Sequence, residues 1–270
     1  MADRRHLLLA AAVGLAAGVV AGLFGIGGGV IIVPALVMFL RLPQLQAAAV
    51  SLVAIAVGTV SALVPFIANE RVSWAGGLVL AVGAIVGSWA GSHFADRVPE
   101  RVLAWTFVVV VLTAAVRMLL PGASGTATVL DLDVVATLLL LAVGLVAGAL
   151  AALLGIGGGV IYVPALVILF DLVQQKAQGT SLVAILPAAV IGAIGHARAG
   201  RMRWGVAWSV AAGSFLGGFG GALLAQAIPA DRLQIAFGVL LVVVAVRLAV
   251  TAGKTPAQVN PPRGPGAPPT

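Results

Sequence analysis

Apolar residues run along this chain in long stretches, which short polar segments separate. Most stretches are close to or longer than the roughly 20 apolar residues that a helix needs to cross a bilayer. The pattern therefore predicts an all-α polytopic membrane protein with about eight transmembrane helices. The stretches cover residues 7–40, 46–68, 74–95, 102–120, 134–170, 177–195, 204–228 and 233–250.

The composition supports a membrane location and narrows the function classes. Hydrophobic residues make up 61% of the 270 residues and charged residues 9%, whereas a soluble domain carries about 25% charged residues. The net charge of +7 comes from Lys and Arg spread over loops and chain ends. That distribution is typical of cytoplasmic loops and excludes a nucleic-acid-binding face. Cysteine is absent, and the spans hold no acidic pair or known catalytic motif, so we expect no enzyme activity, cofactor or metal site.

The sequence repeats itself at a constant offset of 130 residues (151 − 21 = 130). Residues 21–37 match 151–167, and the pentapeptide Ser-Leu-Val-Ala-Ile occurs at both 51–55 and 181–185. Trp, Gly, Pro and Arg positions match in the same register, which chance similarity of apolar sequence does not produce. We therefore expect a first transmembrane repeat, a connecting loop, a second repeat and a disordered Pro-rich tail. Their bounds are 1–120, 121–133, 134–250 and 251–270.

The first stretch of each copy contains a glycine-rich segment, at 25–29 and at 155–159. As one helix, residues 7–40 would be about 50 Å long, against a hydrocarbon core of about 30 Å. Four glycines within five residues, followed by Pro34, weaken the helix there. We therefore expect a break at 25–29 and a second, shorter helix over 30–40, so that the first segment of each four-span repeat is either broken by glycines or re-entrant.

Such breaks indicate a transport pathway. Unpaired backbone groups at membrane depth are tolerated where they line a cavity, and paired breaks in two repeats are typical of transporter binding sites. The N–H groups that open the second helix favour an anion. The predicted substrate-binding glycines are Gly25, Gly27, Gly28, Gly29, Gly155, Gly157, Gly158 and Gly159. The alternative is that glycines only permit close helix packing, and we favour that interpretation for Gly83, Gly87, Gly91, Gly213, Gly217 and Gly221.

Polar residues inside spans are costly and often mark pathways. Ser51 and Ser181 are equivalent in the repeat, and Gln178 and Thr180 lie beside Ser181, so these four are predicted to bind substrate. For the serines, a bond back to the same helix is an equally good interpretation. Weaker candidates are Gln44, Gln46, Ser88, Ser92, His93, Ser209, Ser214 and Gln226.

His196 stands at the edge of a span, within a basic cluster that also holds Arg198, Arg201 and Arg203. A cytoplasmic loop explains the arginines without any further function. We include His196 among the substrate-binding candidates, as an anion ligand or a proton-linked group.

Three motifs carry a resemblance to a known family. They are Gly-Ile-Gly-Gly-Gly-x-Ile-x-Val-Pro at 25–34 and 155–164, Gln-Gly-Thr-Ser-Leu at 178–182, and His-x-x-x-Gly-x-x-x-Trp at 196–204. With them, the sequence resembles the TauE/SafE sulfite exporter family, also called the 4-toluene sulfonate uptake permease family, over nearly the whole chain apart from the tail. Related proteins usually carry an acidic residue before the Trp, where this chain has Ser73 and Arg203. No acidic role there can be carried over.

The resemblance implies a prokaryotic inner-membrane carrier with about eight spans. It implies sulfite, sulfonates, sulfoacetate or related sulfur oxyanions as cargo, and an ion gradient rather than ATP as the energy source. The residues alone indicate only a small anion. The predicted function is therefore secondary transport of small anions by alternating access around a site at the repeat interface.

The predicted partners are a small anionic substrate and the lipid bilayer, while a coupling ion and a homo-oligomer are left open. A non-transporting membrane scaffold is one alternative. A transporter of another solute class is the other, and a metal cation would require intramembrane carboxylates or a Met/His array, which the spans lack.

The Lys and Arg residues also bear on orientation. With eight crossings and a cytoplasmic N-terminus, ten of these residues lie inside and five outside. If the short helices after the breaks also return across the membrane, the split becomes eleven to four and the copies are inverted. Both arrangements place both termini in the cytoplasm, and the counts leave the two open.

Overall fold

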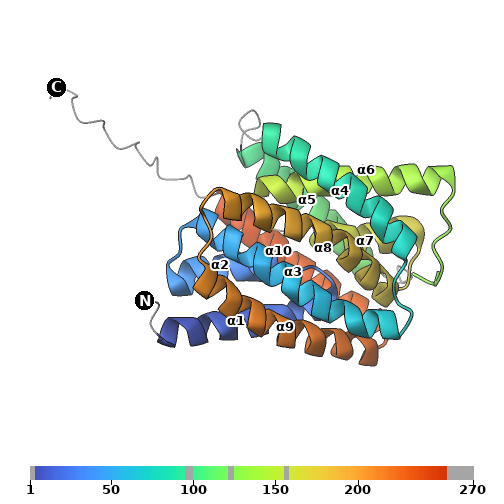
Figure 1. Cartoon of the computed structure of the whole chain (residues 1–270). Helices are drawn as coiled ribbons and strands as arrows, with labels where there is room; N and C mark the ends of the chain where they lie inside the picture. The colour runs from blue at the N-terminus through green and yellow to red at the C-terminus, as the bar shows by residue number, and fades with distance from the viewer. Residues whose placement is uncertain (1–3, 95–99, 121–124, 155–157, 254–270) are drawn as a thin grey trace, which may run out of the picture.

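The computed structural model describes residues 4–94, 100–120, 125–154 and 158–253, with side chains throughout except at 91–94, 100–104, 151–154 and 251–253. In those residues the chain forms ten α-helices, shown in Figure 1. Their bounds are α1 Arg4–Phe24, α2 Gly29–Leu40, α3 Gln44–Ala68, α4 Trp74–Phe94, α5 Glu100–Leu119, α6 Val134–Leu154, α7 Gly159–Phe170, α8 Gln174–Arg198, α9 Trp204–Ala227 and α10 Ala230–Gly253. The predicted tail beyond Gly253 lies outside the described residues.

The helices form an all-helical polytopic membrane protein. Five of them within the described ranges, α1, α3, α8, α9 and α10, are long and apolar enough to cross a membrane, and the others carry shorter apolar segments. Large apolar side chains point outward along the bundle, as at Leu8 and Trp89, where they suit a lipid environment. The predicted all-α class is confirmed, while the number of crossings stays a prediction.

The first glycine-rich segment interrupts the helix as predicted. Helix α1 ends at Phe24 and α2 begins at Gly29. Between them Gly25, Gly27 and Gly28 have φ angles of 68°, 77° and 79°, a region that glycine enters without steric cost. We call residues 25–28 the first break. Helix α2 has 12 residues, about 18 Å, so it reaches only part of the way across a bilayer.

The second half of the chain has the same order of elements. Helices α1 to α5 begin at residues 4, 29, 44, 74 and 100, and α6 to α10 begin at 134, 159, 174, 204 and 230. Each start in the second half therefore lies 130 residues after its counterpart (134 − 4 = 130). Residues 155–157, which include the predicted site residues Gly155 and Gly157, lie outside the described residues.

Glycines allow the first helix of each half to pack closely on the fourth helix of the other half. Figure 1 shows α1 beside α9 and α4 beside α6. A Cβ added at Gly18 of α1 would lie 2.7 Å from the carbonyl oxygen of Ser214 in α9. Gly14 and Gly22 meet Val210 and Gly218 in the same way. Because the residue numbers rise together on both helices, α1 and α9 run parallel.

The glycines predicted to serve packing make the same kind of contact. Gly83 and Gly87 of α4 lie against the main chain of α6, and Gly213, Gly217 and Gly221 of α9 lie against α1. Small residues permit this approach between membrane helices. The packing interpretation is confirmed for these five residues, and the surroundings of Gly91 lie outside the described residues.

Helices α3 and α8, which hold the same position in the two halves, cross in antiparallel directions at the centre. Leu52 of α3 lies 3.0 Å from the Cβ position of Gly192, whereas Ile55 is paired with Ile185 around Gly27. Rising numbers on α3 thus meet falling numbers on α8. Helix α3 instead runs parallel to α9, since Gly58 lies against Ser214 and the Ser61 hydroxyl donates to the Phe215 carbonyl oxygen (2.7 Å).

Candidate functional site

The first break meets the start of α7 near the centre of the bundle. A Cβ added at Gly159 would lie 2.6 Å from the Cα of Ile26 and 2.8 Å from Cδ1 of Ile185. Gly27 lies between Ile55 and Ile185, with its Cβ position 3.2 Å and 3.1 Å from their Cγ2 atoms. The described parts of the two glycine-rich segments, residues 25–29 and 158–159, therefore lie close together.

Several backbone groups at the first break are paired within the described residues. The N–H of Gly25 donates to the carbonyl oxygen of Ala21 (2.8 Å), and Ile31 and Ile32 both donate to that of Gly28 (3.0 Å each). The N–H groups of the first turn of α2, at Gly29 and Val30, have no acceptor within their own helix. They lie at the positive end of the α2 dipole, where an anion is stabilised.

Helix α8 supplies polar side chains to this break. The hydroxyl of Ser181, which is fully buried, lies 2.7 Å from the carbonyl oxygen of Gly25 and 2.7 Å from that of Gln178. Since a hydroxyl has one proton, it donates to one of the two at a time. Gly25 also lies directly against Gln178, because its Cβ position is 2.8 Å from the Cα of that residue. The first half and α8 therefore meet at a polar contact.

Gln178 is fully buried, and neither its amide nitrogen nor its amide oxygen has a hydrogen-bond partner. Gln174, one helical turn earlier on the same face, is also buried with both amide atoms unpaired. Leaving such a group unsatisfied costs about 1–3 kcal/mol. A glutamine amide can donate two N–H bonds to an oxygen-rich ligand, and Gln178 lies beside the break.

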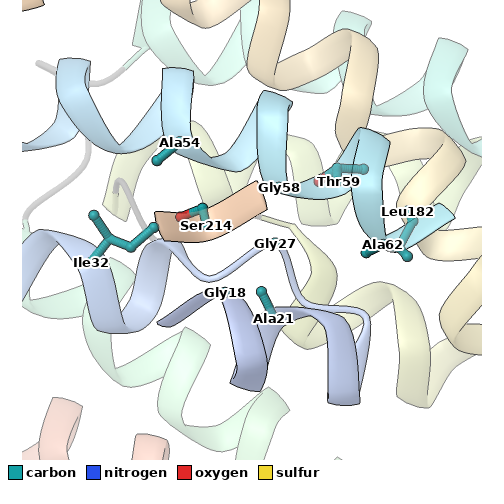
Figure 2. Close-up of a pocket in the computed structure, with 10 residues that line it drawn as sticks. All are labelled: Gly18, Ala21, Gly27, Ile32, Ala54, Gly58, Thr59, Ala62, Leu182 and Ser214. Carbon is teal, nitrogen blue, oxygen red and sulfur yellow. The ribbon is translucent and has the colours of Figure 1, made fainter. Parts of the chain in front are cut away.

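A small cavity lies beside the first break, between α1, α3 and α9 (Figure 2). Its volume is about 10 Å³, counted as the space open to the centre of a water molecule, which is about one water. Thr59 and Ser214 carry the side-chain oxygens in its wall. The Thr59 hydroxyl is buried without a partner, while that of Ser214 donates to Gly14 (3.2 Å). The lining residues are Gly18, Ala21, Gly27, Ile32, Ala54, Gly58, Thr59, Ala62, Leu182 and Ser214.

The second half lacks the polar groups of this cavity. At the 130-residue offset, Thr59 corresponds to Ala189 and Ser214 to Ala84. Ile32 corresponds to Tyr162, whose buried ring lies against the Cβ position of Gly158. A polar cavity of this kind therefore belongs to the first break, and Gly158 is covered by an aromatic ring.

The remaining predicted residues make other contacts. The hydroxyl of Ser51 donates to Ala48 of its own helix (2.8 Å), as that of Ser181 can donate to Gln178. Gly155, the counterpart of Gly25, lies outside the described residues. Thr180 accepts a bond from the N–H of Ser73 (3.0 Å) and so holds the start of α4. His196 lies 18 residues after Gln178 on α8, about 27 Å along the helix. The structure therefore does not bring His196 to the break.

The residues brought together are Gly25, Gly27, Gly28, Gly29, Gly159, Gln178 and Ser181. The sequence argument missed Thr59 and Gln174. Both are polar residues in or at the end of an apolar span, and that signal alone would have included them. The weaker candidates Ser92 and His93 have side chains outside the described residues.

Basic residues lie near both ends of α8. At its start, Arg71 touches Gly179 through its main chain, and the Lys176 ammonium donates to the carbonyl oxygen of Glu70 (2.8 Å). At its other end Arg198 and the following Arg201 are exposed. Positive charge at the two ends of α8 raises the local concentration of anions there.

Comparisons with known proteins show the family to which the chain is related. A family profile described as Sulfite exporter TauE/SafE matches residues 2–136 and 139–270. The probable membrane transporter protein YunE of Bacillus subtilis (strain 168) is 24% identical over 257 residues, covering 87% of this chain and 94% of the relative. A probable membrane transporter protein of Xylella fastidiosa (strain Temecula1) is 27% identical over 233 residues, covering 83% and 88%. No solved structure matches the chain.

Proposed function

The chain belongs to the TauE/SafE sulfite exporter family, and from that premise we propose that this membrane transporter carries small anions, namely sulfite, sulfonates or related sulfur oxyanions. It is a secondary transporter that works by alternating access, with the substrate bound where the two halves meet. It resides in a prokaryotic inner membrane. The energy comes from an ion gradient.

The contact between the first break and α8 carries this proposal. There Gln178, whose amide is unpaired, and the hydroxyl of Ser181 lie against Gly25, and α2 begins four residues later at Gly29. Hydrogen-bond donors from a broken helix of one half and an intact helix of the other suit an oxyanion at membrane depth. Gly25, Gly27, Gly28, Gly29, Gly159, Gln178 and Ser181 form the proposed site, and Gly155, Gly157, Gly158, Ser51, Thr180 and His196 line the rest of the pathway.

We propose further that the two halves are inverted repeats, over 1–120 and 134–250. The eight longer helices cross the membrane, and α2 and α7 lead the chain back to the side of the membrane on which α1 and α6, respectively, begin. The antiparallel crossing of α3 and α8 supports this arrangement. Motion of one inverted repeat against the other is a common basis of alternating access.

The basic residues favour a cytoplasmic position for both termini. Eleven fall on the side of the first turn of α1: Arg4, Arg5, Arg41, Arg97, Arg101, Arg198, Arg201, Arg203, Arg247, Lys254 and Arg263. Four fall on the other side: Arg71, Arg117, Lys176 and Arg232.

Flux into vesicles tests the proposal. Purified protein is placed in liposomes, and uptake of labelled sulfite, methanesulfonate and acetate is followed beside protein-free vesicles. We expect protein-dependent uptake of the two sulfur oxyanions and little of acetate. If the protein moves neither sulfur oxyanion, the proposed cargo is wrong, and a scaffold or another solute class takes its place.

A further inference from the structure

The proposed pathway carries no charge of its own between the two ends of the bundle. The polar side chains buried in the described residues are all uncharged: Ser51, Thr59, Ser61, Gln174, Gln175, Gln178, Thr180, Ser181, Ser214 and Gln234. An anion at the first break therefore meets amides, hydroxyls and backbone N–H groups, and no buried Lys or Arg of the described residues.

The sequence of the surrounding helices extends this observation. Residues 7–40, 42–69, 177–195 and 204–230, which include α2, α9 and nearly all of α1, α3 and α8, contain no Asp, Glu, Lys, Arg or His. Tyr162 of α7 is the one phenol on the elements around the break, and His196 stands at the far end of α8. These helices therefore offer an anion few side chains that could gain or lose a proton.

Among the described residues on and beside α8, charged side chains stand near the two ends of the helix. Lys176 and Arg71 are partly exposed at the start of α8, and Arg198, Arg201 and Arg203 are exposed at its other end. These groups attract anions to the bundle. None of these groups is among the atoms next to Gly27, which are side-chain carbons of Ile55 and Ile185.

The free energy of moving an ion into such a medium rises with the square of its charge, so a dianion costs about four times as much as a monoanion. Neutral donors return only part of this cost. We propose that the species which passes the first break carries a single net negative charge. Resting on the proposed function, this names the cargo as hydrogen sulfite and monosulfonates, and excludes the sulfite and sulfate dianions.

A matched pair of probes tests the charge rule. Methanesulfonate and sulfate share a tetrahedral sulfur with three equivalent oxygens and differ by a methyl group in place of the fourth oxygen, so one is a monoanion and the other a dianion. In vesicles containing the purified protein we expect methanesulfonate uptake to exceed sulfate uptake at least about tenfold. Comparable rates for the two probes would overturn the inference and leave the proposed function standing.

A pH series with sulfite tests the same rule within one compound, because hydrogen sulfite loses its proton near neutral pH and becomes the dianion. At constant total sulfite, protein-dependent uptake should fall as pH rises in proportion to the hydrogen sulfite fraction, while methanesulfonate uptake stays constant. Protein-free vesicles correct for passive entry of sulfur dioxide at low pH. Sulfite uptake that is undiminished at alkaline pH would overturn the charge rule. No protein-dependent uptake of any sulfur anion at any pH would overturn the proposed function and the inference together.

Discussion

The hydroxyl of Ser181 donates to the carbonyl oxygen of Gly25 over 2.7 Å, and this bond joins residues 156 positions apart in the chain. Gly25 follows the last residue of α1 with a φ of 68°, while Ser181 lies in the first third of α8. The bond therefore connects the backbone of the first break to the second half of the protein. A transporter that moves one half against the other must preserve or exchange contacts of this kind.

Replacing Ser181 by Ala tests the contribution of this hydrogen bond. The change leaves the buried Gly25 carbonyl without that donor, so we expect the free energy of unfolding to fall by about 1–3 kcal/mol and the uptake rate to fall several-fold. Thermal unfolding and vesicle uptake measure the two effects. Thr113→Val is the control, since the Thr113 hydroxyl is exposed and bonds only to Val109 of its own helix. Wild-type uptake by Ser181→Ala would contradict the proposed role of this bond.

Gln178→Leu should separate ligand binding from stability. Both amide atoms of Gln178 are unpaired, so exchanging them for an apolar side chain is expected to leave the unliganded protein as stable as before or more stable. Methanesulfonate should raise the unfolding temperature of the wild type and not that of Gln178→Leu, because a ligand stabilises only the state that it binds.

Gln234→Leu is the matched control for that experiment. The buried Gln234 amide donates to the Met118 carbonyl oxygen (3.1 Å) and so connects α10 to α5. Its loss should lower the unfolding temperature and retain the ligand-induced increase. The same ligand effect in Gln178→Leu as in the wild type would remove Gln178 from the site.

The Gly28→Ala variant tests the backbone of the first break. Gly28 has a φ of 79°, and an added Cβ would lie 3.1 Å from Cβ of Ala21. A non-glycine residue in this conformation costs about 1–2 kcal/mol, and a shift of the break should abolish uptake. At Gly220 an added Cβ has no neighbour within 4 Å, so Gly220→Ala should transport normally. Equal uptake by both variants would show that the course of the break does not matter for transport.

Accessibility of single cysteines tests the inverted arrangement. The chain has no cysteine, so Arg71→Cys and Arg201→Cys each present one thiol. Arg71 follows α3 and Arg201 follows α8, and these helices run in opposite directions. A membrane-impermeant maleimide should therefore label one variant from outside the cell and the other only from inside. Labelling of both from the same side would contradict the arrangement.

The features of the fold that depend on glycine alone could be predicted from the sequence. Four glycines within 25–29 predicted a break, and Gly25, Gly27 and Gly28 do adopt the left-handed conformation there. The spaced glycines of α4 and α9 predicted close helix contacts, and at Gly83 and Gly213 the contacts are with main-chain atoms. Both features depend on the absence of a Cβ in glycine, so the residue type alone is enough to predict them.

The direction of the helices and the contact of Ser181 with the first break could not be predicted in this way. Apolar residues cover α3 and α8 alike, so their composition does not indicate that the two run antiparallel. The bond from Ser181 reaches a carbonyl oxygen 156 residues away, at Gly25. It depends on a distant segment of the chain, which the residues around Ser181 do not indicate.

The most direct test of the account is counterflow of sulfite through the purified protein. Vesicles are loaded with unlabelled sulfite and diluted into labelled sulfite. Wild type and Gln234→Leu should accumulate the label transiently, and Gln178→Leu should not. If all three accumulate it equally, transport does not pass the contact between Gln178 and the first break, and if none does, sulfite is not the cargo.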